Sequence, residues 1–364
     1  MKKILLSGYF GFDNSGDDAI LKAMVEDFKK LNRDIEIRVL SKNPHKTQKT
    51  YEVLASDRFN FFNVLGEIKN TDLFISGGGS LLQDITSTRS LLYYLFLIFT
   101  AKFFGKKVYV YANGIGPIDR PFNRFLTKKA LEGAGFITLR DQNSYNFVKK
   151  LGLKNKNIKV TADPVFTLES ISEDETLKIF ADEGIEINNK TIGICVREWK
   201  KAPDLKEKLA RVCDTLVLMG YDVLLVPFHL PKDHIYSMDL INLCLNHDHI
   251  KMVTKTYSAR QLMGIFKKLK LILAMRLHSI IYASVSNLPI VGLIYDPKVT
   301  AMIEQLEIKE YIDVENFKEE ELLEKVKSAL LNLGERKKEL YKNTENIKEK
   351  SKENIEIAIK LLEK

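Results

Sequence analysis

The stretch KILLSGYFGFDNSGDDAIL, residues 3–21, decides the fold class of the first half of the chain. It predicts a buried strand over Lys3–Tyr9, a glycine-containing turn, and an amphipathic helix over Asp17–Leu31. A continuous apolar strand that leads into a helix is typical of a parallel sheet covered on both faces. The stretch resembles the start of a signal peptide, but no small-residue cleavage site follows it, so we interpret it as a first strand.

The same alternation of apolar strands and amphipathic helices continues along the chain. In the first half it predicts a further helix over Phe122–Leu131 and strands over Ile35–Leu40, Asp72–Ser76, Lys107–Ala112, Phe136–Leu139 and Ile158–Thr161. In the second half it predicts strands over Thr191–Val196, Asp222–Val226, Lys251–Val253, Leu271–Ala274 and Ile290–Leu293. We therefore expect an α/β fold with two Rossmann-like domains facing a cleft, because ligands of such folds bind where the strands end.

The polar stretch Glu169–Glu175 is the expected domain boundary. It separates an N-terminal domain at residues 1–168 from a C-terminal domain at 169–316. The remaining segment, 317–364, is highly charged and predicted to be helical, and we expect it to pack back on the N-terminal domain.

Composition excludes several classes of protein. The chain has 364 residues, of which 45% are hydrophobic and 29% charged, which is typical of a globular protein and not of a disordered one. A net charge of +8 favours an anionic partner, although the Lys- and Glu-rich tail accounts for much of this excess. No nucleic-acid-binding signature occurs, so nucleic acid is not an expected partner. Three widely spaced cysteines exclude a disulfide scaffold and a zinc module, and they indicate a reducing, cytoplasmic compartment.

The longest apolar run, Leu91–Phe99, is too short to span a bilayer, which takes about 20 apolar residues. Two interpretations of it stay open. It is either a buried helix between strands, or an interfacial patch that touches an anionic membrane with the help of Lys102, Lys106 and Lys107.

Polar residues follow the first predicted strand. Asn14 or Ser15 is placed to cap the helix, leaving free N–H groups at the expected cleft. Asp17 and Asp18 either stabilise the helix start through its dipole, or one of them orients or deprotonates a sugar hydroxyl. The glycine spacing here is not GxGxxG, so a dinucleotide site is not expected.

Two glycine clusters and an arginine follow the next strands. The triple glycine Gly77, Gly78 and Gly79 lies between a strand and a helix, and we interpret it as a backbone nest for an anion or polar ligand. No Gly-Lys-Ser/Thr follows it, which disfavours an NTPase. The second cluster is Asn113–Pro117. Arg140 then ends a strand, and it either points into the cleft or forms a local ion pair with Asp141.

Cations also follow the strands of the second half. These are Arg197, Arg276, His278 and Lys298, and His278 opens an apolar helix. Together with Arg140, the last three form a set suited to a small, multiply charged anion such as a phosphate plus a carboxylate. His247 and His249 suit one face of a strand but lack an acidic partner at the right spacing, and the other histidines show no ligand spacing. We therefore expect neither a metal nor a cofactor.

Seven motifs in order resemble the polysaccharide pyruvyl transferase family, of the CsaB cell-wall type. They are GYFGFDNSGDDA, SGGGSLLQD, GIGPI, LRDQNS, ADPVF, RLHSIIYA and YDPK, and they cover about residues 4 to 300. The resemblance implies a GT-B-like architecture and transfer of a pyruvyl group from phosphoenolpyruvate, a co-substrate, to a sugar. The product would be a cyclic ketal, commonly on N-acetylmannosamine of a lipid-linked cell-wall precursor. Asp18 departs from the family, since a glutamate is more usual there, and the aromatic segment at Leu91–Phe104 is longer than expected.

The resemblance also implies roles for individual residues. Arg140, His278 and Lys298 would bind the donor, aided by Arg276 and Arg197, and Lys298 or His278 would neutralise the departing phosphate. His278 is the candidate general acid, because imidazole titrates near neutral pH. Asn14, Asp18 and the Gly77–Gly79 loop would meet the acceptor, with Asp17 as candidate base. The expected partners are phosphoenolpyruvate, a sugar or lipid-linked saccharide, and an anionic membrane surface at its cytoplasmic face.

Two other functions are compatible with the sequence. A GT-B glycosyltransferase would use the same cations for the diphosphate of a nucleotide sugar, with Glu304 available for the ribose. A non-catalytic basic protein would bind anionic polysaccharide or membrane without turnover. Glycine-lined strand ends argue against this last possibility, because a surface binder does not need them.

Overall fold

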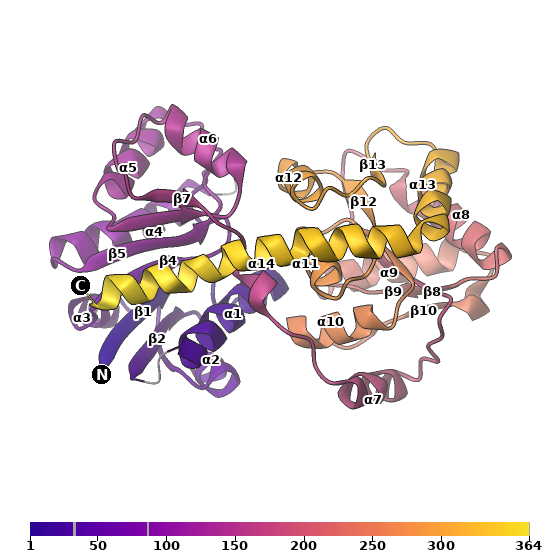
Figure 1. Cartoon of the computed structure of the whole chain (residues 1–364), viewed down its shortest axis with the longest axis horizontal. Helices are drawn as coiled ribbons and strands as arrows, with labels where there is room; N and C mark the ends of the chain where they lie inside the picture. Colours follow the sequence, from indigo (N-terminus) through magenta and orange to yellow (C-terminus); the bar gives the residue numbers. More distant parts are fainter. Residues whose placement is uncertain (32–33, 86, 364) are drawn as a thin grey trace. The chain divides into compact units, whose positions relative to one another are not determined.

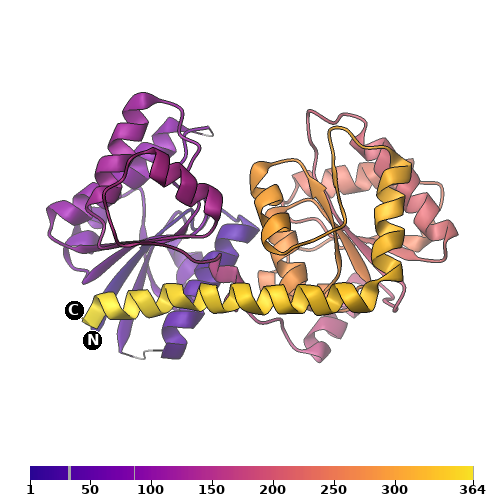
Figure 2. The ribbon, with the colours of Figure 1, turned by 45° about the horizontal axis from the view of Figure 1, so that its top comes forward.

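The computed structural model describes residues 1–31, 34–85 and 87–363. The chain forms two compact units. Unit 1 comprises Met1–Leu168 together with the end of the chain from Ile347, and unit 2 comprises Glu169–Asn346. Each unit is built on one parallel sheet with helices on both sides (Figure 1 and Figure 2).

Within the described residues, the sheet of unit 1 has seven strands in the order β3-β2-β1-β4-β5-β6-β7. The strands are β1 (Lys2–Ser7), β2 (Ile35–Ser41), β3 (Leu54–Asp57), β4 (Leu73–Gly77), β5 (Lys107–Asn113), β6 (Phe136–Leu139) and β7 (Ile158–Val160). The helices are α1 (Ser15–Leu31), α2 (Pro44–Tyr51), α3 (Phe61–Lys69), α4 (Thr88–Phe103), α5 (Pro121–Glu132) and α6 (Gln142–Lys150), followed by the 3₁₀ helix η1 (Pro164–Thr167). Because β1 pairs with both β2 and β4, the strand order reverses between β1 and β4.

The side chains of β5 point alternately to the two faces of this sheet. Val108 and Val110 pack into a core shared with helices α3 to α6. Tyr109 points to the opposite face, where its hydroxyl donates to the carbonyl of Asn354 in helix α14 (Leu333–Glu363). Successive residues of a strand point to opposite faces, so α3–α6 and the last turns of α14 cover different sides of the sheet.

Within the described residues, the sheet of unit 2 has six strands in the order β10-β9-β8-β11-β12-β13. The strands are β8 (Thr191–Cys195), β9 (Asp222–Leu225), β10 (Ile250–Met252), β11 (Leu271–Ala274), β12 (Ile290–Ile294) and β13 (Tyr311–Asp313). The helices are α7 (Glu173–Glu183), α8 (Leu205–Leu218), α9 (Lys232–Leu243), α10 (Ala259–Lys267), α11 (Leu277–Val285), α12 (Pro297–Gln305) and α13 (Glu319–Leu331), with the 3₁₀ helix η2 (His247–His249). Here the strand order reverses between β8 and β11.

All eleven predicted strands are confirmed to within about two residues at their ends, and two strands were not predicted. The missed strands, β3 and β13, are four and three residues long and form sheet edges. Every β3 residue keeps some solvent exposure, so the strand lacks the continuous apolar run by which the others were predicted.

The chain divides after Leu168, at the start of the polar stretch Glu169–Glu175. The C-terminal segment differs from the prediction. Residues 317–346 belong to unit 2, where Arg336 forms an ion pair with buried Glu310, and only the residues from Ile347 belong to unit 1. There the buried Asn354 side chain accepts from Thr161 Oγ1 at 2.7 Å and donates to the carbonyl of Ala162 at 3.0 Å.

Candidate functional site

The start of α1 lies beside the carboxyl end of β1 in unit 1. Asn14 precedes the helix, and its side-chain oxygen accepts from the amide of Gly16 at 3.1 Å. It therefore acts as the N-terminal cap, which is the structural role that the sequence allowed for it. Asp18 faces Asp13 and Lys46; burial and the charge of Asp13 raise its pKa to about 6, while Lys46 opposes the rise.

Asp17 has the higher pKa of the two carboxyl groups at this edge. Burial is the largest cause of its perturbation and raises its pKa to about 7. The charge of Asp18 raises the pKa further, and that of Arg140 lowers it. A Cβ atom on Gly79 would lie 2.9 Å from Oδ1 of Asp17, so the carboxyl group lies directly against the loop after β4. A carboxyl group that titrates near neutral pH at a sheet edge has the properties of a general base.

The triple glycine has a different explanation from the anion nest that we predicted. A Cβ on Gly77 would lie 2.8 Å from Met24, and one on Gly78 would lie 2.1 Å from Ile20, because α1 packs directly onto this loop. The amide of Gly78 donates to the carbonyl of Tyr111, so it is not available to an anion. Packing requires the first two glycines, and only Gly79 faces a candidate site residue.

Arg140, after β6, is the central cation of this edge. It is 5% exposed, and its guanidinium donates to Asp163 Oδ2 at 3.1 Å and to Ser80 Oγ at 2.8 Å. The predicted alternative, an ion pair with Asp141, is secondary at 3.7 Å, because the Asp141 side chain caps α6. A Cβ on Gly114 would lie 3.0 Å from Arg140 Nε, so the glycine leaves that side of the guanidinium uncovered by a side chain.

Sequence reasoning missed Arg58, which follows the unpredicted strand β3. The side chain is 6% exposed and donates to the carbonyl of Gly8 at 2.7 Å, in the loop after β1. Its guanidinium lies over the rings of Phe12 and Tyr93, at 5.1 and 4.5 Å from their centroids, and its charge lowers the pKa of Asp17. The sequence LASD of β3 contains no β-branched or aromatic residue, so no local signal marked Arg58 as a residue that follows a strand.

In unit 2 the predicted cations follow adjacent strands. Arg197 follows β8, Arg276 and His278 follow β11, and Lys298 follows β12, so the sheet order brings them to one edge. Arg140 belongs to unit 1, and its convergence with these cations stays a prediction.

Asp233, which sequence reasoning missed, holds Arg276 in place. It is 2% exposed, forms an ion pair with Arg276 Nη2, and accepts from the amides of Phe228 and His229 at 3.2 and 3.0 Å. Nε of Arg276 is buried without a hydrogen-bond partner in the described chain. The signal was the sequence PFHLPKDH, residues 227–234, which follows the predicted strand Asp222–Val226 and places a carboxylate at the same edge as the cations.

His278 and Lys298 each lie in the first turn of a helix. His278 is in α11, where its ring centroid lies 6.0 Å from that of Tyr282, and the next residue, Ser279, is fully buried. Lys298 is in α12, whose cap Asp296 accepts from the Lys298 amide at 2.8 Å. The first turn of a helix favours anions through its free N–H groups and its dipole.

Arg197 and Glu304 are two further residues that the sequence predicted for the site. The guanidinium of Arg197 lies over the Tyr295 ring at 5.6 Å, and Tyr295 packs against Trp199. Glu304 is exposed near the end of α12, six residues after Lys298 and so about 9 Å further along the helix axis. This distance from the sheet edge does not favour Glu304 as a ribose ligand.

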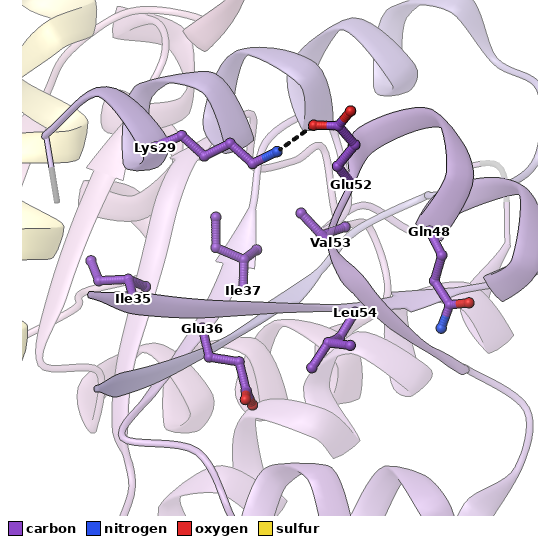
Figure 3. A pocket seen from close by; sticks show the side chains of 8 residues that line it. All are labelled: Lys29, Ile35, Glu36, Ile37, Gln48, Glu52, Val53 and Leu54. Atoms are coloured by element: carbon purple, nitrogen blue, oxygen red, sulfur yellow. Dashed lines mark hydrogen bonds and ion pairs between the residues drawn. The ribbon is translucent and has the colours of Figure 1, made fainter. Parts of the chain in front are cut away.

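No group of three potential metal ligands occurs among the residues that the structure describes. His247 and His249 lie in a 3₁₀ helix, so the prediction that they suit one face of a strand was wrong. His249 Nδ1 pairs with Asp222 at 2.8 Å, a residue distant from it in the sequence. A hollow of about 540 Å³ lies at the amino ends of β2 and β3, beside the Lys29–Glu52 ion pair (Figure 3). None of its lining residues belongs to the candidate site.

Replacing Asp233 with asparagine should raise the KM for the donor that the sequence predicts, phosphoenolpyruvate, about tenfold, with a smaller change in kcat, because Arg276 loses the charge that orients it. Asp214→Asn is the matched control. Asp214 is also buried and accepts from the amides of Leu245 and Asn246, but it pairs with no arginine in the described chain. Both variants should lose stability in thermal unfolding. Equal donor KM values for the two variants would show that Asp233 has only a structural role.

A family model described as polysaccharide pyruvyl transferase matches residues 14–297. The chain belongs to the polysaccharide pyruvyl transferase family. This confirms the resemblance drawn from the seven motifs. A curated relative, the amylovoran biosynthesis protein AmsJ of Erwinia amylovora, is 20% identical over 397 aligned residues, covering 92% of this chain and 93% of AmsJ. The family and this relative support a role in modifying polysaccharide.

Solved structures show which fold the family member has. UDP-GlcNAc 2-epimerase from Neisseria meningitidis, bound to UDP-GlcNAc, matches with a TM-score of 0.68 and covers 98% of this chain and 100% of its own. Anabaena Alr3699/HepE, in complex with UDP and glucose, gives 0.66 with 99% of both chains covered. E. coli ADP-heptose heptosyltransferase II gives 0.54 with 92% and 100% covered. All three are 14% identical to the pyruvyl transferase chain, so they confirm the GT-B-like α/β fold and nothing about ligands.

Proposed function

We propose that this family member transfers the pyruvyl group of phosphoenolpyruvate to two hydroxyls of one sugar, forming a cyclic ketal and releasing phosphate. The observation that carries the donor assignment is the row of cations after adjacent strands β8, β11 and β12 in unit 2. Phosphoenolpyruvate carries a phosphate and a carboxylate a few ångströms apart. Arginine binds either group with two parallel hydrogen bonds, and lysine supplies a point charge.

The donor chemistry assigns a role to each residue at this edge. Arg276, oriented by Asp233, binds one anionic group of the donor, and the first turn of α11, which no side chain caps, adds free N–H groups. His278 gives a proton to the methylene carbon, which leaves an oxocarbenium-like centre at C2. Lys298 neutralises the negative charge of the phosphate as the bond between C2 and the phosphate oxygen breaks. Arg197 contributes long-range positive charge.

The acceptor chemistry needs two deprotonations. The first sugar hydroxyl attacks C2 and gives its proton to a base, and after phosphate leaves, the second hydroxyl attacks and loses its own proton. One of the two hydroxyl protons restores to His278 the proton that it gave to the methylene carbon, and the other leaves as part of hydrogen phosphate, so the reaction balances. Asp17 is the proposed base, because burial brings its pKa to about 7, and Gly79 lets the acceptor approach its carboxyl group. A lipid-linked N-acetylmannosamine saccharide at the cytoplasmic membrane face is the proposed acceptor.

The test is phosphate release from phosphoenolpyruvate in the presence of N-acetylhexosamine acceptors, with the ketal product identified by mass and NMR. His278→Ala should lower kcat by about 10²–10⁴-fold, the usual contribution of a general acid. A rival nucleotide-sugar transferase would bind UDP-sugars instead. Phosphoenolpyruvate should therefore raise the unfolding temperature and UDP-sugars should not. Stabilisation by UDP-sugars alone, or turnover unchanged in His278→Ala, would refute the proposal.

A further inference from the structure

Helices α3 and α4 of unit 1 expose a row of large apolar side chains. On α4 these are the exposed Leu92, Phe96 and Phe103 and the half-buried Phe99, which also packs against the core, and their spacing places them on one side of the helix. Phe61 and Phe62 of α3 extend the row, and the Phe61 ring stacks on Phe96 at 5.8 Å. We call these six residues the aromatic face. Phe62 and Phe103 are 82% and 85% exposed, so nothing in the described chain covers its two ends.

The exposed phenylalanine side chains are concentrated in one part of the chain. In the described residues, every phenylalanine that is classed as exposed lies between positions 59 and 125, in or beside α3, α4 and α5. The rest of α4 is the buried helix that the sequence allowed as one interpretation, with Leu91, Leu95 and Ile98 in the core. Single exposed apolar residues are ordinary on a protein surface, whereas a contiguous aromatic patch marks an interaction surface.

The surroundings of the aromatic face are basic. Helices α3, α4 and α5 carry six basic residues, namely Lys69, Arg89, Lys102, Arg124, Lys128 and Lys129. They carry two acidic residues, Glu67 and Glu132, and each lies within 4 Å of a basic side chain. α4 itself has no acidic residue, so the charge beside the apolar row is positive.

Not all of the cations that the sequence indicated lie beside the aromatic face. Lys107 Nζ donates to the carbonyl of Leu361 in α14, which packs on the opposite face of the sheet. Lys102 stays near the row, 5.4 Å from the Phe99 ring, although its ammonium donates to the carbonyl of Lys129. Arg89 and Lys129 are exposed at this surface.

We propose that the aromatic face is a docking surface for an anionic phospholipid bilayer, with its phenylalanines at the headgroup boundary and the flanking cations against lipid phosphates. Apolar side chains beside basic ones are the combination by which interfacial helices bind anionic membranes. Within the described residues no helix is long and apolar enough to cross a bilayer, and docking does not require one. The surface adjoins the candidate site, because Phe59, next to the aromatic face, contacts Phe12 of the loop that leads to Asp17. The proposal does not depend on the identity of the donor.

The first test is sedimentation of the full chain with vesicles of phosphatidylcholine, alone or with phosphatidylglycerol. Binding should require the anionic lipid and weaken with salt. Phe62→Ser with Phe103→Ser should reduce binding at least about tenfold, and Arg89→Glu with Lys129→Glu should reduce binding to anionic vesicles to the level seen with phosphatidylcholine alone. Leu245→Ser with Leu331→Ser is the matched control, since both leucines are 85% exposed but lie in unit 2. Equal binding by the phenylalanine and leucine variants would refute the proposal.

The second test locates the contact. The three native cysteines are buried, so an environment-sensitive fluorophore can be attached selectively at Phe103→Cys or, as control, at Leu331→Cys. Anionic vesicles should shift the emission to the blue only at position 103. If light scattering instead shows an oligomer that Phe62→Ser and Phe103→Ser dissociate, and vesicles do not bind, a second copy covers the face and the proposal is wrong. Phosphate release with a water-soluble acceptor, measured without vesicles, tests the proposed reaction separately.

Discussion

Asp17→Asn is expected to lower kcat for pyruvyl transfer by about 10²–10⁴-fold, because asparagine cannot accept a proton from the attacking hydroxyl. In the wild-type enzyme, burial raises the pKa of Asp17 to about 7. A base acts in its ionised form, so turnover should rise as the pH passes upward through about 7. The residual activity of Asp17→Asn should lack this rise. The measurement is kcat against pH for both proteins, by phosphate release.

The same substitution should make the protein more stable above neutral pH. The raised pKa means that the folded chain keeps a proton on Asp17 between about pH 4 and 7, where the unfolded chain has lost it. Stability therefore falls as the pH rises through this window, by up to about 4 kcal/mol, and asparagine removes this loss. The free energy of unfolding, measured in denaturant at pH 4 and pH 8, should show a gain for Asp17→Asn at pH 8 only.

Asp27→Asn is the matched control for Asp17. Asp27 lies on the same helix, burial raises its pKa to about 6, and its carboxylate accepts from Thr167 at 2.8 Å. It lies ten residues, or about 15 Å, further along α1 from the sheet edge. Asp27→Asn should change the pH dependence of stability but leave the kcat–pH profile unchanged. The same loss of turnover in both variants would assign the effect to the fold of α1 and not to a base.

Arg140→Ala is expected to have the largest effect on the fold of unit 1 as well as on activity. The Asp163 side chain is fully buried, and Arg140 is its ion-pair partner at 3.1 Å. Removing one partner of a buried pair costs about 3–5 kcal/mol, because the remaining charge is left in an apolar environment. The pKa of Asp17 should also rise, since the charge of Arg140 lowers it. Denaturant unfolding and the kcat–pH profile measure the two effects.

Arg140→Lys separates catalysis from folding. Lysine keeps the positive charge beside Asp163 but cannot bridge Ser80 and Asp163 in the way that the planar guanidinium does. This variant should fold, recover much of the lost stability, and remain impaired in turnover per folded molecule. Arg38→Ala controls for loss of an arginine: its ion pair with Glu67 is one-third exposed, so about 1 kcal/mol should be lost without a change in kcat. Full activity of Arg140→Lys would make Arg140 purely structural.

The buried strands were predictable because each is a short, continuous apolar run, and such runs have few alternatives to a central parallel strand. The edge strands β3 and β13 were not, because they are only four and three residues long and, apart from Ile312, their residues are partly or fully exposed, so pairing within the sheet defines them. Because β3 was not predicted, Arg58 was not recognised as a residue of the candidate site. Without that strand, Arg58 was an arginine in a loop, whereas in the structure it follows a strand and its charge acts on Asp17.

Sequence by itself determined the fold class, the family and the residues that follow the strands, because strand periodicity and motif order are local properties of the chain. Only the tertiary structure decided the role of each residue. Gly77 and Gly78 make room for α1, Arg140 pairs with Asp163 and not chiefly with Asp141, and Asp233 orients Arg276. Ion pairs, burial and pKa shifts depend on which distant segments meet, and no local pattern encodes those distances.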